Sequence, residues 1–150
     1  MLIKPTNDMK KICFILAALC CLTTMEAKTN GIPSELFKDG KIKYEKATNT
    51  LILEDGFKFS QSKGLVIFDT GKDLRIRLKG SAEFRASLLS KDNLIIEAEK
   101  PATLSITSNI SGSALQCPAL TVNKDATVSL FSRNSREGMY ALSCDAISVN

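Results

Sequence analysis

A nine-residue segment occurs twice in this 150-residue chain, and the repeat constrains the fold more than any other feature. Residues 114–122 read Ala-Leu-Gln-Cys-Pro-Ala-Leu-Thr-Val, and residues 141–149 read Ala-Leu-Ser-Cys-Asp-Ala-Ile-Ser-Val, which is a spacing of 27. A period of about 20–50 residues is typical of solenoid and array proteins, in which each unit stacks on the previous one. The repeat therefore predicts a stack of similar units.

Short apolar or alternating segments, separated by turn residues, indicate that these units are made of strands. The clearest is 74–78, Leu-Arg-Ile-Arg-Leu, whose strict alternation is typical of a strand with one buried face. No stretch after residue 27 keeps a helical period, although 30–38 is expected to hold one short helical turn. The pattern predicts an all-β fold, a right-handed parallel β-solenoid of about four to five coils over 41–150, preceded by a linker or cap over 28–40.

Aligning successive strands at their first leucines predicts which charged side chains lie beside one another on the outer face. The leucines in question are Leu51, Leu74 and Leu94. This alignment places Glu54, Arg77 and Glu97 in one outward column, and it pairs Lys79 with Glu99. The alternative is that these charges are unrelated and solvated, because exposed pairs contribute only about 0.2–1 kcal/mol.

Several of these segments resemble a loose family of secreted β-helix proteins of bacterial surfaces. The resemblance rests on 44–55, Tyr-Glu-Lys-Ala-Thr-Asn-Thr-Leu-Ile-Leu-Glu-Asp, on 74–80, Leu-Arg-Ile-Arg-Leu-Lys-Gly, and on 93–96, Asn-Leu-Ile-Ile. It covers about 41–150 and implies the fold, together with carbohydrate binding or a function not yet known. No metal or sugar residue carries over, because no matching site motif is present.

Two other folds are alternatives to the solenoid. A leucine-rich repeat is matched only in part, by 104–109, Leu-Ser-Ile-Thr-Ser-Asn. A β-sandwich is compatible with regular short strands, but it does not account for the 27-residue repeat.

The first 27 residues have the three-part form of a secretory signal peptide. A basic start, Met9-Lys10-Lys11, precedes an apolar run of 11 residues over 12–22, which is shorter than the roughly 20 residues needed to span a bilayer. We expect cleavage after Ala27, with Met1 or Met9 as the start, and export to the periplasm, the cell surface or the medium. The alternative is a lipid anchor at Cys20 or Cys21, which sit at the end of the apolar run.

The expected mature chain keeps two cysteines, Cys117 and Cys144, at matching positions of the repeat. Stacked one coil apart, their Cα atoms fall within disulfide range, and an exported environment permits a disulfide. The alternative, which we favour, is a pair of free thiols in an inward aliphatic stack, because buried Cys behaves as a small hydrophobe.

Composition argues against several kinds of chemistry. The chain has no His, which excludes His-based acid–base catalysis and His-ligated metals, and its net charge of +4 is too small to predict nucleic-acid binding. The aspartates of the mature chain lie mostly in turns, where turn hydrogen bonding accounts for them. These are Asp55, Asp69, Asp73, Asp92, Asp125 and Asp145. We therefore predict no catalytic residue, no metal and no cofactor.

Ligand-binding candidates are few. Arg75, Arg77 and Lys79 form an outward basic row that suits an anionic glycan or a membrane surface, unless it is a solvated strand face whose charge acidic neighbours neutralise. Tyr44 is a candidate aromatic platform, whereas Phe57 and Phe59 are expected in the core or in an end cap.

The segment 147–150 lies within or just after a strand and is not followed by a polar cap. An open rung invites strand addition, so end-to-end self-association through residues near Val149 is one expectation, and a shortened version of a longer solenoid is the other. The predicted function is a secreted, non-catalytic module that binds a polysaccharide or cell-surface glycan. A polysaccharide-active enzyme and a scaffold that docks through the open rung are the alternatives.

Overall fold

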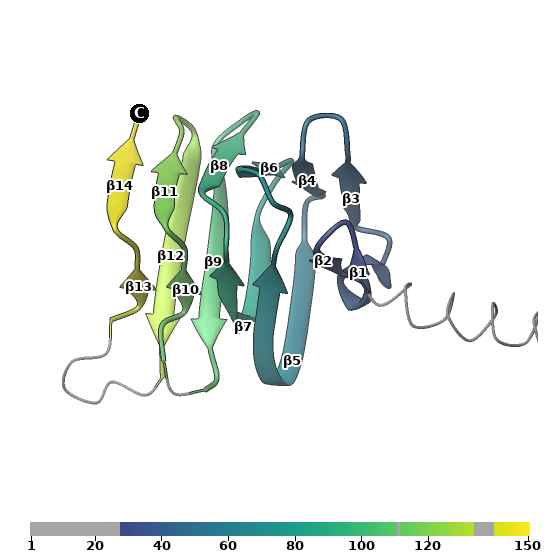
Figure 1. Cartoon of the computed structure of the whole chain (residues 1–150). Helices are drawn as coiled ribbons and strands as arrows, with labels where there is room; N and C mark the ends of the chain where they lie inside the picture. Colours follow the sequence, from purple (N-terminus) through teal and green to yellow (C-terminus); the bar gives the residue numbers. More distant parts are fainter. Residues whose placement is uncertain (1–27, 111, 134–139) are drawn as a thin grey trace, which may run out of the picture.

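The structure is a computed structural model that describes residues 28–110, 112–133 and 140–150. Within these ranges the chain forms strands and one short 3-10 helix, without an α-helix. Figure 1 shows the strands side by side, in an order that follows the sequence from the N-terminal cap to the C-terminal rung. The predicted signal peptide and the lipid-anchor cysteines lie outside the described residues. None of the helical segments described is long and apolar enough to cross a membrane.

One sheet, which we call the first sheet, runs the whole length of the solenoid. Its strands are β3 (Ile42–Glu45), β4 (Thr50–Leu53), β6 (Leu74–Leu78), β8 (Leu94–Ala98), β11 (Ala119–Val122) and β14 (Ala146–Val149). Neighbouring strands from β4 to β14 are parallel, and each comes from the next coil of the chain.

A second sheet forms the remaining sides of the coil. Its strands are β5 (Phe57–Phe68), β7 (Ala82–Ser90), β9 (Ala102–Ser108), β10 (Leu115–Gln116), β12 (Ala126–Ser132) and β13 (Leu142–Ser143). The first part of β7 pairs with β9, and its last part pairs with β10, so the sheet divides into two sides there. Each coil thus has three sides, and four coils are stacked in parallel. The predicted parallel β-solenoid is confirmed, and its parallel strands in two sheets rule out both the sandwich and the leucine-rich repeat.

The 27-residue repeat corresponds to two successive coils. Leu115 pairs with Leu142, and Leu120 pairs with Ile147, as the sequence match predicts. The register predicted between 74–79 and 94–99 is also confirmed, because Arg77 pairs with Glu97.

The register predicted for the first strand pair is wrong. Leu51 pairs with Ile76 rather than with Leu74, so Glu54 does not lie beside Arg77. A slip of two residues keeps the same side chains pointing inward, so alternation alone does not distinguish the two registers.

The core is a column of apolar side chains between the sheets. Each coil contributes residues from all three sides, such as Leu78, Phe84 and Leu88, which are almost completely buried. Removing such a column from water is the main source of stability for a fold whose coils contact only their neighbours.

The N-terminal end of this column is covered. The covering elements are β1 (Lys28–Thr29), β2 (Ile32–Pro33), the 3-10 helix η1 (Ser34–Phe37) and β3. Strand β3 is antiparallel to β4, and Ile32 and Leu36 are buried in the core. The helical turn expected within 30–38 is confirmed as η1. Gly31 has a φ of +78°, and a Cβ there would overlap the Asp69 carbonyl, so only glycine fits this close approach.

Candidate functional site

The basic row on the first sheet is engaged in ion pairs. Glu97 accepts hydrogen bonds from Arg75 Nη1 and from Arg77 Nε, both at 2.9 Å, and Lys79 pairs with Glu99. Burial opposes ionisation of Glu97, but the two arginine hydrogen bonds outweigh it, so the pKa of Glu97 is lowered. The three predicted ligand candidates therefore lie together, but their charge is largely balanced within the sheet.

Tyr44 has a structural partner as well. Its hydroxyl donates a hydrogen bond of 2.6 Å to Asn49 Oδ1, and its ring packs against the core. Tyr44 therefore links β3 to the corner before β4, which is a different role from a free aromatic platform.

Turn aspartates bond to the backbone of a neighbouring coil. Asp92 accepts hydrogen bonds from the backbone N–H groups of Thr70 and Gly71, and Asp55 accepts one from the N–H of Ser81. These contacts are the turn role that the sequence predicts. In the part of the chain that the structure describes, no group of three or more His, Cys, Asp or Glu side chains is placed to hold a metal ion.

Cys117 and Cys144 occupy equivalent positions of successive coils, and both are free thiols. The backbone N–H of Cys117 donates to the Ser143 carbonyl at 3.1 Å, which fixes the stack. Burial, with a smaller contribution from the neighbouring Cys144, raises the pKa of Cys117 to about 11. Cys117 is thus a buried, largely protonated side chain at neutral pH, in the manner of a small hydrophobe.

A different surface carries polar groups without partners in the protein. On β9 and β12 the inward positions are apolar apart from Ser108 and Ser132. The outward positions carry hydroxyls apart from Phe131, which is 59 % exposed and pairs with Thr107. We call this surface the hydroxyl face: Thr103, Ser105, Thr107, Thr127 and Ser129. Thr103 lies beside Thr127 and Ser105 beside Ser129, so the hydroxyls form rows across the coils at the usual strand spacing of about 4.8 Å.

These five side chains are half-buried or exposed. Within the described ranges none of their hydroxyls donates or accepts a hydrogen bond to the protein. Each hydroxyl therefore has both a donor and two acceptor lone pairs available to a ligand or to water. This surface stands out because the other polar groups discussed above are already bonded to neighbours.

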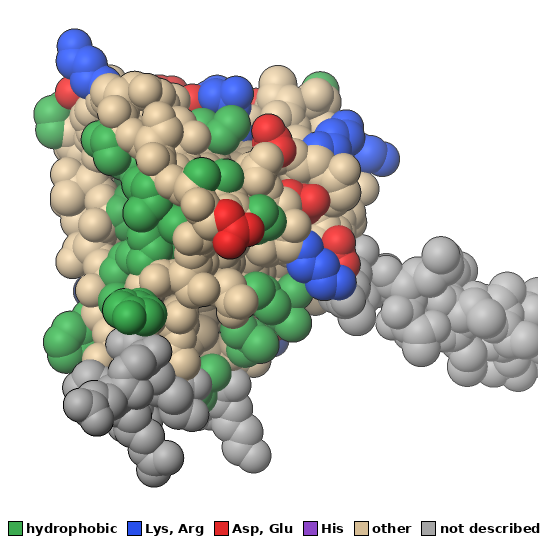
Figure 2. Space-filling model, turned by 60° about the vertical axis from the view of Figure 1, so that its left-hand side comes forward, with side chains coloured by type: hydrophobic (Ala, Val, Ile, Leu, Met, Phe, Trp, Pro, Cys, Tyr) green, Lys and Arg blue, Asp and Glu red, His purple; other side chains and the backbone are tan. Residues whose placement is uncertain are grey.

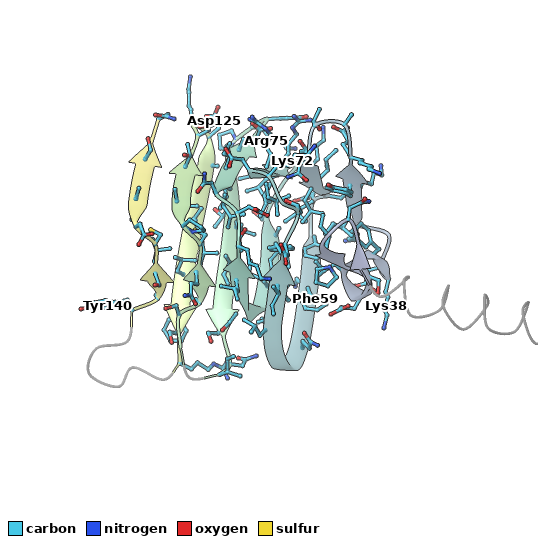
Figure 3. The ribbon with its side chains drawn as sticks, in the orientation of Figure 1. Lys38, Phe59, Lys72, Arg75, Asp125 and Tyr140 are labelled. Carbon is cyan, nitrogen blue, oxygen red and sulfur yellow. The ribbon has the colours of Figure 1, made fainter. Side chains whose placement is uncertain are left out.

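The same side of the solenoid is hollowed toward the N-terminal cap. A depression of about 320 Å³ lies between β5, β7 and β9, lined in part by Lys58, Glu83, Thr103 and Ser105. A second of about 320 Å³ adjoins it at Lys58, where Phe59 and Gln61 face Lys38 and acidic residues of the cap. Figure 3 shows Phe59 and Lys38 close together at this end. The two depressions join the hydroxyl face to a half-buried aromatic ring.

Charge on this surface is also distinctive. Arg85 pairs with Glu83 at 2.8 Å on the same strand, whereas the ammonium of Lys58 makes no ion pair with the described residues. The surface thus offers two ammonium groups without an ion pair among the described residues, those of Lys58 and Lys38, together with an aromatic edge and rows of hydroxyls.

The hydroxyl face was not among the candidates from the sequence, although the sequence contains a pattern that indicates it. Residues 103–107 read Thr-Leu-Ser-Ile-Thr and residues 127–129 read Thr-Val-Ser, with hydroxyl and apolar residues alternating. Alternation predicts the inward apolar residues Leu104, Ile106 and Val128 and the outward hydroxyls equally well. Alternation does not predict that β9 pairs with β12, and this pairing brings the two segments together.

Fold and surface place the chain in a structural class, the parallel β-solenoids. No protein-family model matches it, and neither a curated protein nor a solved structure is significantly similar to it.

Proposed function

We propose that this protein is an exported, non-catalytic β-solenoid module that binds a polysaccharide or cell-surface glycan through the hydroxyl face and the adjoining depressions. The observation that carries the proposal is the set of unpartnered hydroxyls in register on β9 and β12. A saccharide chain presents hydroxyl donors and acceptors at regular intervals, and rows of Ser and Thr on a rigid sheet meet them without a conformational change. The signal-like segment 1–27 supports export.

The depressions add features that suit the same ligand class. Phe59 offers an apolar edge, and its ring lies 6.0 Å from that of Phe84, so it is held in place by the core. Lys58 and Lys38 supply ammonium groups, and Glu35 and Asp39 supply carboxylates, that can bind polar groups of a polysaccharide. The surface is shallow and open, which fits a chain lying across coils better than a small molecule enclosed in a pocket.

The test is binding of the whole expected mature chain to a glycan array and to insoluble polysaccharides in a pull-down assay. In the double variant Thr103→Val with Ser105→Ala, two ligand hydrogen bonds are lost at about 1 kcal/mol each, so affinity for the best ligand should fall about tenfold or more. Thr121→Val is the matched control, because Thr121 lies on β11 in the first sheet and is equally half-buried.

Phe59→Leu separates the aromatic contribution from that of the hydroxyls. It keeps an apolar side chain toward the core and should weaken binding. Loss of the ring contact with Phe84 should lower the free energy of unfolding by only about 1 kcal/mol, so the variant stays folded in the binding assay. Absence of binding to every glycan tested, or equal affinity of the double variant and the Thr121→Val control, would overturn the proposal.

A further inference from the structure

Cys117 and Cys144 occupy one column of inward side chains on two successive coils. The residues just before them, Gln116 and Ser143, are register partners, and both cysteines pack against the hydrophobic core. Both are free thiols. The stack of coils therefore brings two sulfur atoms together, each of which is able to bind a metal ion after losing its proton.

The two cysteines also line one depression at the corner between β10 and β11. Its volume is about 250 Å³, and three successive coils line it, since Ser90 of β7 occupies the equivalent position one coil before Cys117. The depression thus follows the side of the solenoid along its axis. It gives a small ion access to Cys117, whose residue is only 4 % exposed.

Oxygen ligands are sparse at this corner. Figure 2, which brings the C-terminal coils forward, shows a band of hydrophobic side chains there, with charged side chains mostly at its margins. Among the described residues that line the depression, Asp145 carries the only carboxylate. The corner therefore offers two soft sulfur ligands, which suit a soft metal ion better than Mg²⁺ or Ca²⁺.

The spacing of the coils distinguishes among the reactions open to two thiols. Stacked strands lie about 4.8 Å apart. A disulfide needs Cβ atoms about 3.8 Å apart, so the two parallel side chains would have to tilt toward each other. A metal–sulfur bond is about 2.3 Å long, so an ion bonded linearly to two sulfurs spans about 4.6 Å between them. Linear coordination by two thiolates thus fits the coil spacing without a movement of the backbone.

We propose that Cys117 and Cys144 form a two-coordinate site for a soft monovalent metal ion, of which Cu(I) is the biological example. On binding, each thiol releases its proton to solvent and each sulfur forms one bond to the ion, whose oxidation state does not change. The bound unit carries one negative charge, and the Gln116 amide and the Ser143 hydroxyl line the same depression as hydrogen-bond donors. The site is separate from the hydroxyl face and does not depend on glycan binding.

The experiment is an anaerobic titration of the whole expected mature chain with Cu(I), in competition with a chromophoric Cu(I) chelator. The wild type should bind one ion per chain and release protons into weakly buffered solution. Zn(II), which takes four ligands in structural sites, should bind at least about a hundredfold more weakly.

Cys144→Ser is the informative variant, because Cys144 is only partly buried and the variant should keep the wild-type denaturation midpoint. Loss of a group that merely supports a metal ligand weakens binding by about 10–100-fold, so loss of a ligand itself should weaken Cu(I) binding at least about a hundredfold. Thr121→Val is the matched control. It removes a polar side chain from the neighbouring β11 without changing either sulfur, and it should bind Cu(I) like the wild type.

Loss of binding in Cys144→Ser with its retention in Thr121→Val supports the site. A wild type that does not bind Cu(I) overturns it, as does a Cys144→Ser variant with wild-type affinity. One ion bound by two chains overturns it as well, because the two sulfurs then come from different molecules. Zn(II) binding as tight as that of Cu(I), or a disulfide between the two cysteines in the exported protein, also contradicts a linear two-thiolate site.

Discussion

Replacing Asn49 tests whether one corner residue holds the N-terminal cap on the first coil. Asn49 is buried and has a φ of +49°, a conformation that asparagine tolerates better than most residues. Its Oδ1 accepts the 2.6 Å hydrogen bond from Tyr44. Its Nδ2 donates to Thr70 Oγ1 at 2.9 Å and to the Asp73 carbonyl at 2.8 Å. One amide therefore connects β3 to the corner of the next coil.

The magnitude follows from these contacts. Nδ2 also contacts the Lys72 carbonyl at 3.2 Å, so its two N–H groups are shared among three acceptors. Asn49→Ala removes these two donors and the Oδ1 acceptor, at about 1 kcal/mol for each group, and places alanine in the left-handed region at about 1 kcal/mol more. The free energy of unfolding should fall by about 3–4 kcal/mol, a large share of the 5–15 kcal/mol typical of a domain. Tyr44→Phe removes only one of the bonds and should cost about 1 kcal/mol.

The assay is urea denaturation followed by circular dichroism. With a slope of about 1–3 kcal/mol per molar urea, Asn49→Ala should lower the midpoint by at least about 1 M. The double variant completes a thermodynamic cycle, in which Tyr44→Phe should cost nothing once Asn49 is alanine. The reasoning fails if Asn49→Ala costs less than about 1 kcal/mol, or if Tyr44→Phe costs the same in both backgrounds.

Two further predictions concern ionisable groups. Glu97→Gln leaves Arg75 and Arg77 without their carboxylate and should lower the free energy of unfolding by about 1–2 kcal/mol at pH 7. Because the pKa of Glu97 is lowered on folding, its contribution to stability is present above the unfolded pKa and is lost as pH falls through the folded pKa. The wild type and Glu97→Gln should therefore differ little in free energy of unfolding at about pH 2. A difference at that pH as large as the one at pH 7 contradicts the ion-pair account. For the thiols, iodoacetamide at pH 8 should modify Cys144 much faster than Cys117, whose pKa is about 11. Peptide mass spectrometry measures both rates, and equal rates would contradict the burial of Cys117.

Much of the fold could be read from local patterns. Alternation at 74–78 predicts which side chains point inward, and the 27-residue repeat predicts that Leu115 stacks beside Leu142. The failure at Leu51 has a clear cause. Inward and outward positions alternate with a period of two, so a shift of two residues changes the partners of a strand without changing its buried face.

The candidate site was harder to predict than the fold. The basic row was a candidate because a run of like charges on one strand face predicts an anion-binding surface. In the structure Glu97 forms ion pairs with both Arg75 and Arg77 and balances part of that positive charge. Ser and Thr at outward positions are unremarkable singly. They become a surface only when β12 pairs with β9 in register.

The amino-acid sequence by itself determined the strands, their inward faces and the stacking of the last two coils, because alternation and repetition are properties of neighbouring residues and of fixed spacing. Only the tertiary structure decided which outward polar groups have hydrogen-bond or ion-pair partners in the protein and which remain available to a ligand. Such contacts between coils join residues about 20–27 positions apart, and the register of the strands determines which side chains meet. The same holds for burial, because it depends on what the rest of the chain places over a side chain rather than on that side chain's own chemistry.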